Sequence, residues 1–201
     1  RIIKDNGAIV LFAQGMFTAQ LMMSNPDMWR YNLIWDKMFV SGFLNAKKMP
    51  MRSHEDILVF YKSLPTYNPQ MTTGQPLHGK GTSYKNKDVI NNCYGDIKGT
   101  EDDRKGSTEK YPTSIVRFQK PHPSCAVHPT QKSVELCEWL IKTYTNEGET
   151  ILDNCMGSGT TGVAAINTDR NFIGIELTEK YFKIAEERIN SAVEDKRCQL
   201  F

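Results

Sequence analysis

The sequence predicts an α/β fold of the Rossmann-like type, carrying one irregular insertion. Three observations lead to this prediction. Short apolar stretches alternate with helical ones in the first third of the chain and again in the last third. A glycine-rich turn in the last third joins an apolar stretch to a helical one. Between the two thirds, over residues 64–127, the alternation stops.

Residues 1–63 are expected to form the first half of the core. Apolar and β-branched stretches predict strands at residues 8–13, 31–36 and 56–62, and a helix is expected over 16–23. The stretch at 8–13 is apolar on both faces, which is typical of a buried parallel strand with a neighbour on each side.

Residues 64–127 are rich in Tyr, Asn, Gly, Lys, Thr and Pro, and are expected to form an irregular insertion. The segment holds nine basic and six acidic residues, a net charge of +3, with five interleaved aromatic residues. Only residues 88–90 and 114–118 resemble short strands. Loops of this length inside a compact domain are uncommon and are usually functional or disordered. We expect a functional role, with a solvated surface loop as the alternative.

Residues 128–201 are expected to form the second half of the core. A helix is predicted over 130–145, with Pro129 in its first turn. Its apolar face is expected to hold Val134, Cys137, Leu140 and Ile141. Strands and helices then alternate to residue 196, which predicts a βαβα unit with parallel strands and a right-handed crossover.

Composition narrows the class of protein. The net charge of the 201 residues is only +2, so any surface for nucleic acid must be local. The five cysteines are scattered without a C-x-x-C pair, which favours a reducing, cytoplasmic setting over disulfides or a structural metal. Apolar runs are far shorter than the roughly 20 residues of a membrane span. The first residue is Arg1, and we expect the chain to begin inside a longer reading frame.

The strongest motif is the glycine-rich turn ILDNCMGSGTTGVAA. Gly157, Gly159 and Gly162 match G-x-G-x-x-G, in which glycines allow a tight turn and close approach of a ligand. Glu176 follows Gly157 by 19 residues, where a carboxylate can accept hydrogen bonds from a ribose. These residues alone also fit a nicotinamide oxidoreductase or a purely structural turn.

Asp153, just before the turn, separates these alternatives. A carboxylate there suits a ligand with an ammonium and a sulfonium group better than a pyrophosphate, because anions favour a bare helix N-terminus. Thr160 and Thr161 stand where a nucleotide-phosphate loop needs a lysine followed by Ser or Thr, which excludes an NTPase.

Three segments, HPTQK (128–132), ILDNCMGSGTT (151–161) and IGIEL (173–177), resemble the ordered motifs of amino-group DNA methyltransferases of bacterial or phage type. NLIWDK (32–37) and SHEDILVFYK (53–62) are also similar to segments of that family. The order matches the permuted group, in which a catalytic half comes first, a target-recognition segment second and the cofactor half last. The resemblance covers the chain outside residues 64–127.

The resemblance implies S-adenosylmethionine (SAM) as cofactor, with Asp153 and the turn around its methionine part and Glu176 on its ribose. Ser133 and the pair Asn154-Cys155 depart from the usual family residues. The implied cofactor residues are His128, Pro129, Thr130, Gln131, Lys132, Asp153, Cys155, Gly157, Ser158, Gly159, Thr160, Thr161, Glu176 and Leu177. No metal is implied. His122 and Cys125 form a lone H-x-x-C pair, for which a polar loop is the favoured interpretation.

The family's catalytic tetrapeptide, Asp/Asn/Ser-Pro-Pro-Tyr/Phe, is absent from these residues, and its expected position precedes Arg1. The resemblance implies that this motif holds the target amine and stacks on a flipped base. We therefore expect no catalytic group in this chain and no activity of the chain alone. Trp35 with Lys37, or His54 with Glu55, are candidates to border the base pocket or to serve only the core and surface.

The expected function is methyl transfer from SAM to an exocyclic amine in double-stranded DNA, at adenine N6 by default or at cytosine N4. A noncatalytic SAM- or DNA-binding protein and a nicotinamide oxidoreductase are the alternatives. A homodimer and a role in restriction, replication or phage defence stay open. The residues expected to contact DNA are Lys80, Lys85, Lys87 and Arg117.

Overall fold

The computed structural model describes residues 2–76, 89–91, 95–97 and 106–198. These residues fall into two compact units. The larger unit combines Arg1–Asn68 with Thr113–Phe201, and the smaller unit is Pro69–Pro112. Residues 113–127, which the sequence places in the insertion, belong to the larger unit.

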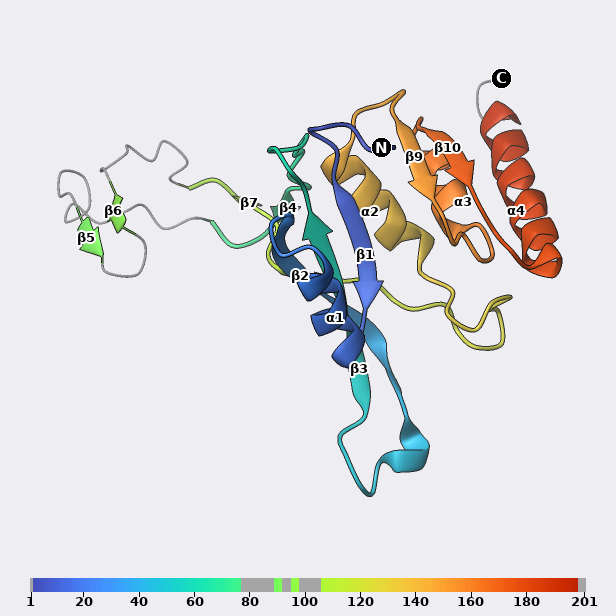
Figure 1. The fold of residues 1–201 in the computed structure, drawn as a ribbon, viewed down its shortest axis with the longest axis horizontal. Helices are drawn as coiled ribbons and strands as arrows, with labels where there is room; N and C mark the ends of the chain where they lie inside the picture. The colour runs from blue at the N-terminus through green and yellow to red at the C-terminus, as the bar shows by residue number, and fades with distance from the viewer. Residues whose placement is uncertain (1, 77–88, 92–94, 98–105, 199–201) are drawn as a thin grey trace. The chain divides into compact units, whose positions relative to one another are not determined.

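The larger unit contains two sheets and four α-helices among its described residues (Figure 1). In chain order its elements are β1 (Ile9–Ala13), α1 (Met16–Ser24), β2 (Trp29–Ser41), the 3-10 helix η1 (Phe43–Asn45), β3 (Arg52–Phe60), β8 (Ile115–Arg117), α2 (Val134–Tyr144), β9 (Thr150–Asp153), α3 (Thr160–Asn167), β10 (Asn171–Gly174) and α4 (Glu179–Cys198).

The first sheet has the order β1-β3-β2-β8. Strand β3 pairs antiparallel with β1 and with β2, and β8 pairs parallel with β2. The prediction that residues 8–13 form a buried parallel strand is therefore wrong. The continuous apolar pattern has another cause, because both faces of β1 are covered: Val10 and Phe12 pack in the cluster that includes α2, and Ile9 and Leu11 pack in the cluster that includes α1.

The second sheet is the parallel pair β9 and β10, with α3 as the connection between them. Asp153 at the end of β9 lies in register with Gly174 at the end of β10. This confirms the predicted parallel βαβ unit. Its helix ends at Asn167, and a left-handed Asp169 with φ of 62° follows before β10 begins.

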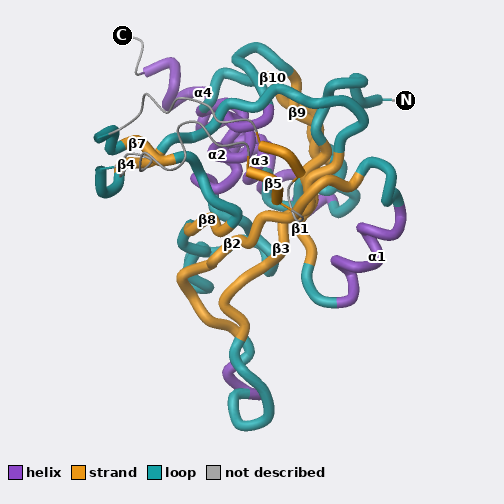
Figure 2. Tube along the Cα trace, turned by 90° about the vertical axis from the view of Figure 1, so that its left-hand side faces the viewer, coloured by secondary structure: helices purple, strands orange, loops and turns teal. Residues whose placement is uncertain are grey.

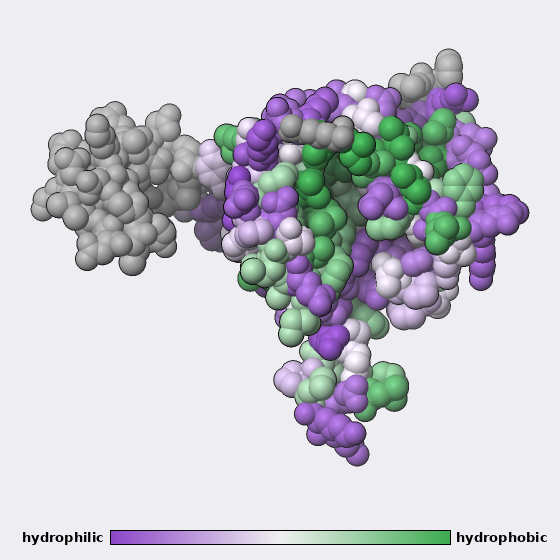
Figure 3. Space-filling model, in the orientation of Figure 1, coloured by the Kyte–Doolittle hydropathy of each residue, from purple (hydrophilic) through white to green (hydrophobic). Residues whose placement is uncertain are grey.

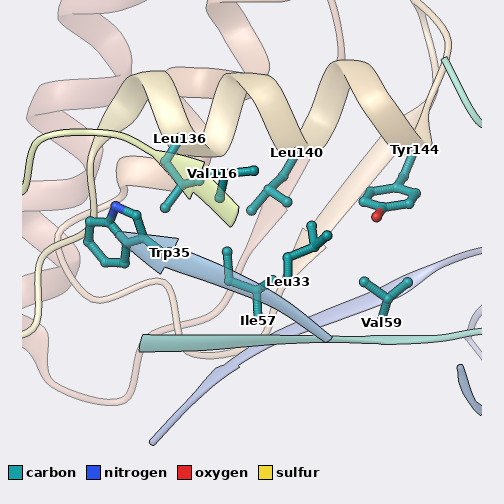
Figure 4. Close-up of a cluster of buried hydrophobic side chains, with 8 residues drawn as sticks. All are labelled: Leu33, Trp35, Ile57, Val59, Val116, Leu136, Leu140 and Tyr144. Atoms are coloured by element: carbon teal, nitrogen blue, oxygen red, sulfur yellow. The ribbon is translucent and has the colours of Figure 1, made fainter. Parts of the chain in front are cut away.

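Helix α2 packs against both sheets by means of two different faces. Leu136, Leu140 and Tyr144 join a buried cluster with side chains of β2, β3 and β8 (Figure 4). Cys137 and Ile141 join a second cluster with α3 and with the sheet of β9 and β10. The four predicted apolar residues are thus divided between two faces, because the helix separates two sheets rather than covering one.

The start of α2 also differs from the prediction. The helix begins at Val134, with Ser133 in an extended conformation before it, and the segment that contains Pro129 is not helical. His128 and Thr130 therefore do not cap the helix. Instead, the backbone N–H of Thr130 donates a hydrogen bond to Nδ1 of His128 (3.3 Å).

The hairpin of β2 and β3 continues well beyond the end of β1 (Figure 2). The sequence predicted β2 to end at Asp36, but the strand continues to Ser41. The register shifts between Asp36 and Ser41, and Met38 there has a φ of 51°, so the extension begins with a β-bulge. We call residues 38–53, which begin at this bulge and include η1, the arm.

The smaller unit contains two short antiparallel ladders among its described residues. Strand β4 (Thr72–Thr73) pairs with β7 (Glu109–Lys110), and β5 (Val89–Asn91) pairs with β6 (Gly95–Ile97). Of the two short strands that the sequence suggested in the insertion, one corresponds to β5 and the other to β8 of the larger unit. Within the described ranges, none of the helices combines the length and the apolar character needed to span a membrane.

The buried contacts of α2 yield a stability prediction. Leu136 is fully buried between α2 and the first sheet, so Leu136→Ala removes apolar contacts and leaves a cavity. We expect a loss of about 2 to 5 kcal/mol in the free energy of unfolding, measured by urea denaturation. Leu64→Ala, at an exposed leucine, is the matched control, with an expected change within about 0.5 kcal/mol. A loss below about 1 kcal/mol for Leu136→Ala would contradict the packing described.

Candidate functional site

The candidate site lies where two adjacent parallel strands end. Strand β9 ends at Asp153, and β10 leads within two residues to Glu176. In open α/β sheets, ligands bind at the carboxyl ends of parallel strands. The turn between β9 and α3 lies at the same edge, and the backbone N–H of Met156 in this turn donates to the carbonyl of Ile175 (3.0 Å). The sheet edge and the turn therefore form one hydrogen-bonded structure.

Asp153 is half-buried and binds the turn through both carboxylate oxygens. Oδ1 accepts a hydrogen bond from the backbone N–H of Cys155 (3.1 Å), and Oδ2 accepts one from Oγ1 of Thr161 (2.7 Å). The aspartate thus connects the first and last parts of the turn. Each carboxylate oxygen can accept more than one hydrogen bond, so Asp153 retains acceptor capacity for a ligand.

Glu176 binds the middle of the same turn. Oε2 accepts a hydrogen bond from the backbone N–H of Gly157 (2.9 Å), and Oε1 accepts one from the backbone N–H of Thr178 (2.9 Å). The hydrogen bond from Thr178, with a further contribution from Gly157, lowers the pKa of Glu176 below its ordinary value. Glu176 is therefore a carboxylate at neutral pH and can accept hydrogen bonds from a ligand. It follows Gly157 by 19 residues in the sequence.

Glycine is required at Gly159 for two reasons. Its φ of 75° lies in the left-handed region, which L side chains rarely adopt. A Cβ at this position would also lie 2.9 Å from Cα of Ala185 in α4. The second glycine of the motif therefore permits close packing between the turn and α4.

The segment 128–132 lies against the turn through His128. A Cβ added to Gly157 would lie 3.5 Å from Nε2 of His128, which places the imidazole directly beside this glycine. The ring of His128 also contacts the ring of Tyr181 edge-on, with centroids 4.3 Å apart. Thr130 and Gln131 make local contacts: Oγ1 of Thr130 lies 3.1 Å from Nδ1 of His128, and Oε1 of Gln131 accepts from the backbone N–H of Val127 (3.0 Å).

Lys132 belongs to a separate, half-buried charge cluster with Glu55 and Lys37. Its Nζ donates a hydrogen bond to Oε2 of Glu55 (2.6 Å), and Nζ of the buried Lys37 lies 3.5 Å from Oε1. Burial alone raises the pKa of Glu55, but the two lysines outweigh it and the net pKa is lowered. Nζ of Lys132 also lies over the rings of Phe12 and Trp35, at 4.8 and 5.6 Å. From the sequence, Lys37 and Glu55 were candidates to border the base pocket and Lys132 was a candidate cofactor residue. Their grouping was not predicted, because they come from three distant segments.

Other predicted cofactor residues have different surroundings. Ser158 and Thr160 are buried, and Arg188 of α4 donates to the carbonyl and hydroxyl oxygens of Ser158. Cys155 is an exposed thiol whose pKa is raised by partial burial and by nearby Asp153. Leu177 is 99% exposed beside Glu176, which is unusual for a leucine. Pro129 is also exposed.

Several other candidates have local roles or fall outside the described residues. Trp35 is fully buried and its indole N–H donates to the carbonyl of Phe118 (2.7 Å), so this residue serves the core. Arg117 is exposed and pairs with Asp36 (3.4 Å). In the described ranges, His122 and Cys125 are not part of any group of three or more side chains able to hold a metal. Three predicted DNA contacts lie where the structure gives no description: Lys80, Lys85 and Lys87.

The βαβ turn and the two carboxylates beside the strand ends, with a histidine next to the turn, are typical of α/β proteins that bind a nucleoside. A family model described as DNA methylase (N6_N4_Mtase) matches residues 1–187, and the chain belongs to this family. The nicotinamide alternative has no support from this assignment.

Individual relatives agree with the family assignment. "Type II methyltransferase M2.DpnII" of Streptococcus pneumoniae is 50% identical over 64 residues, which is 32% of this chain and 24% of the relative. "Type II methyltransferase M2.MboI" of Moraxella bovis is 32% identical over 194 residues, or 94% of this chain and 60% of the relative. The chain thus spans less than two thirds of the length of either.

Among solved structures, the M1.HpyAVI-SAM complex superposes with a TM-score of 0.62 at 27% identity. The match covers 94% of this chain and 77% of that structure. The α/β methyltransferase fold predicted from the sequence is thereby confirmed.

The two reasons for glycine at position 159 can be separated by experiment. Gly148 has a similar φ of 77° but no atom within 4 Å of an added Cβ, so Gly148→Ala introduces backbone strain alone. We expect Gly148→Ala to cost about 1 to 2 kcal/mol of unfolding free energy. Gly159→Ala should cost at least about 1 kcal/mol more, because it also clashes with α4. Equal losses in urea denaturation would show that the close approach to Ala185 is unimportant.

Proposed function

We propose that this protein transfers a methyl group from SAM to an exocyclic amine of a base in DNA. Adenine N6 is the favoured target and cytosine N4 the alternative. The observation that carries the proposal is the pair Asp153 and Glu176. They lie at or just beyond the ends of adjacent strands and bind one glycine turn in a chain of the DNA methylase family. The similar M1.HpyAVI structure is a complex with SAM, which supports the choice of cofactor.

The chemistry of the site fits SAM better than a dinucleotide. The two carboxylates would attract the ammonium and sulfonium of the methionine part, whereas a pyrophosphate would meet two negative charges. Glu176 can accept hydrogen bonds from ribose hydroxyls, and exposed Leu177 beside it offers an apolar surface for adenine. His128, in the segment 128–132, lies beside Gly157 of the turn.

In the proposed reaction, SAM supplies an electrophilic methyl group. The lone pair of the base amine would form the new N–C bond as the C–S bond breaks, which leaves S-adenosylhomocysteine, and the amine would lose one proton to solvent. The residues described here would contribute binding and orientation of the cofactor, which align the reacting atoms. The mechanism requires no covalent enzyme intermediate.

We also propose that a segment outside these 201 residues supplies the group that holds the amine. The family tetrapeptide is absent from the sequence. In the described part, β1 pairs along one edge with β3, and β9 along one edge with β10, while their other edges pair with no strand. Both sheets pack on α2 (Figure 1), so a strand could lie between β1 and β9 and bring the tetrapeptide to the candidate site.

We propose further details of the methylated base, the biological role and the oligomeric state. A 65-residue stretch is 43% identical to "DNA adenine methyltransferase YhdJ" of Escherichia coli, which favours adenine. The names of the type II relatives favour a restriction-modification role with double-stranded DNA as substrate. A homodimer is a further proposal, which analytical sedimentation would test.

Cofactor binding is the first prediction of this proposal. Asp153→Ala and Glu176→Ala each remove a carboxylate proposed to bind SAM, and we expect each to lower SAM affinity by about 1.5 to 3 kcal/mol in calorimetry. Glu147→Ala, at an exposed acid before β9, is the control and should leave affinity unchanged. Unchanged affinity in both site variants, with circular dichroism showing an intact fold, would exclude the assigned site.

Methyl transfer is the second prediction. We expect the full reading frame to transfer label from SAM to unmodified duplex DNA, and the 201-residue chain alone to show none, because its target amine is unaligned. Chromatography of the hydrolysed DNA distinguishes N6-methyladenine from N4-methylcytosine. Labelling by the short chain would show that a catalytic group lies within it, and SAM binding without labelling by the full frame would favour a noncatalytic protein.

A further inference from the structure

The arm exposes apolar side chains at a place where they have no role in the core. Phe43 and Leu44, in η1 at its tip, are 74% and 83% exposed. Met38, Val40, Met49 and Met51 along the arm are also exposed. Figure 3 shows apolar residues next to polar ones on the protruding hairpin. Exposed apolar side chains that gather on one protruding segment are a common feature of interaction surfaces.

The charge of the arm is of one sign. Residues 38–53 contain Lys47, Lys48 and Arg52 and no acidic residue, so the arm carries a net charge of +3. The whole chain, by contrast, is nearly neutral at +2. A surface that is both apolar and basic suits a polyanion with apolar interior surfaces, and double-stranded DNA has both features.

The base of the arm is connected to the candidate site. Glu55, immediately beyond the arm on β3, forms the 2.6 Å hydrogen bond with Lys132. Lys132 ends the segment that begins with His128, whose ring lies beside Gly157 of the turn. Figure 1 shows that β1 and β9 point in a similar direction, toward the side of the larger unit on which the arm projects. DNA bound at the candidate site would therefore be within reach of the arm.

The attachment of the arm is ordered by specific contacts. The backbone N–H of Met38 donates to Oδ1 of Asp36 (3.0 Å) at the bulge, and Oγ of Ser41 donates to the carbonyl of Arg52 across the hairpin (3.3 Å). Phe39 packs edge-on against His122, with ring centroids 6.3 Å apart. These contacts hold the base of the arm in place.

We propose that the arm is a DNA wedge, an inference that rests on the function proposed above. Phe43 and Leu44 insert between base pairs beside the target, and Lys47, Lys48 and Arg52 contact the flanking phosphates. Extruding a base requires unstacking, and apolar side chains that enter the opened step offset part of that cost. A second copy of this chain is a less suitable partner for the tip, because two arms of charge +3 repel each other.

The test uses the full reading frame and a duplex whose methylated site has first been located by labelling. The tip variant combines Phe43→Ser with Leu44→Ser, and Leu64→Ser is the control at an exposed leucine outside the arm. We expect the tip variant to lose at least tenfold in kcat/KM for DNA, with SAM affinity within twofold of wild type. A mismatch at the target base, which makes extrusion easier, should restore most of this loss.

The basic residues are tested separately. Replacing Lys47, Lys48 and Arg52 with Ala should reduce the slope of log DNA affinity against log salt by about 2 to 3, whereas the tip variant should leave the slope unchanged. A tip variant as active as wild type, or a loss that the mismatch does not relieve, would overturn the wedge. A tip variant that only converts a dimer to a monomer in sedimentation would assign the arm to a second copy. Absence of labelling by wild type would instead refute the proposed function.

Discussion

The packing of α2 between two sheets is the interaction on which the rest of the larger unit depends. Leu136, Leu140 and Tyr144 bury one face against the sheet of β1, β2, β3 and β8. Cys137 and Ile141 bury another face against α3 and the parallel pair. The hydroxyls of Tyr31 and Tyr144, 2.9 Å apart, add a polar contact at the first interface. Since the described strands of the two sheets do not pair with each other, α2 carries much of their connection.

The position of α2 explains how residues 128–133 contact both the turn after β9 and strand β3. Helix α2 follows directly after residues 128–133, so its position determines where His128 and Lys132 lie. His128 reaches the turn after β9, while Lys132 reaches Glu55 of β3. Burial of Cys137 at the second face raises the pKa of its thiol to about 12, so this cysteine behaves as an apolar residue.

Much of the fold could be predicted because its signals are local. The turn from Asp153 to Thr161 and the parallel strands around it follow from glycine spacing and short apolar runs, and the structure contains both. The antiparallel partner of β1 could not be predicted, because a run with both faces covered looks the same in parallel and antiparallel sheets. The division of the apolar residues of α2 between two sheets could not be predicted either, because the helical spacing of apolar residues does not show how many sheets a helix contacts.

The features that were missed depend on contacts between distant segments. Lys37, Glu55 and Lys132 form no motif in the sequence, and only the pairing of β2 with β3 and the position of α2 bring their charges together. The arm was missed because residues 38–53 lack the regular alternation of a strand. Bulges and short 3-10 turns have weak sequence signals compared with helices and paired strands.

The hydrogen bonds of Asp153 and Glu176 to the turn have a consequence for binding thermodynamics. Because the protein itself fixes the backbone of Cys155 and Gly157, a ligand at this edge need not order the loop when it binds. Little conformational entropy would then be lost on association, and more of the contact energy would remain as affinity. The turn is in this sense preorganised, because the two carboxylates that we propose as SAM-binding groups also hold its backbone in place.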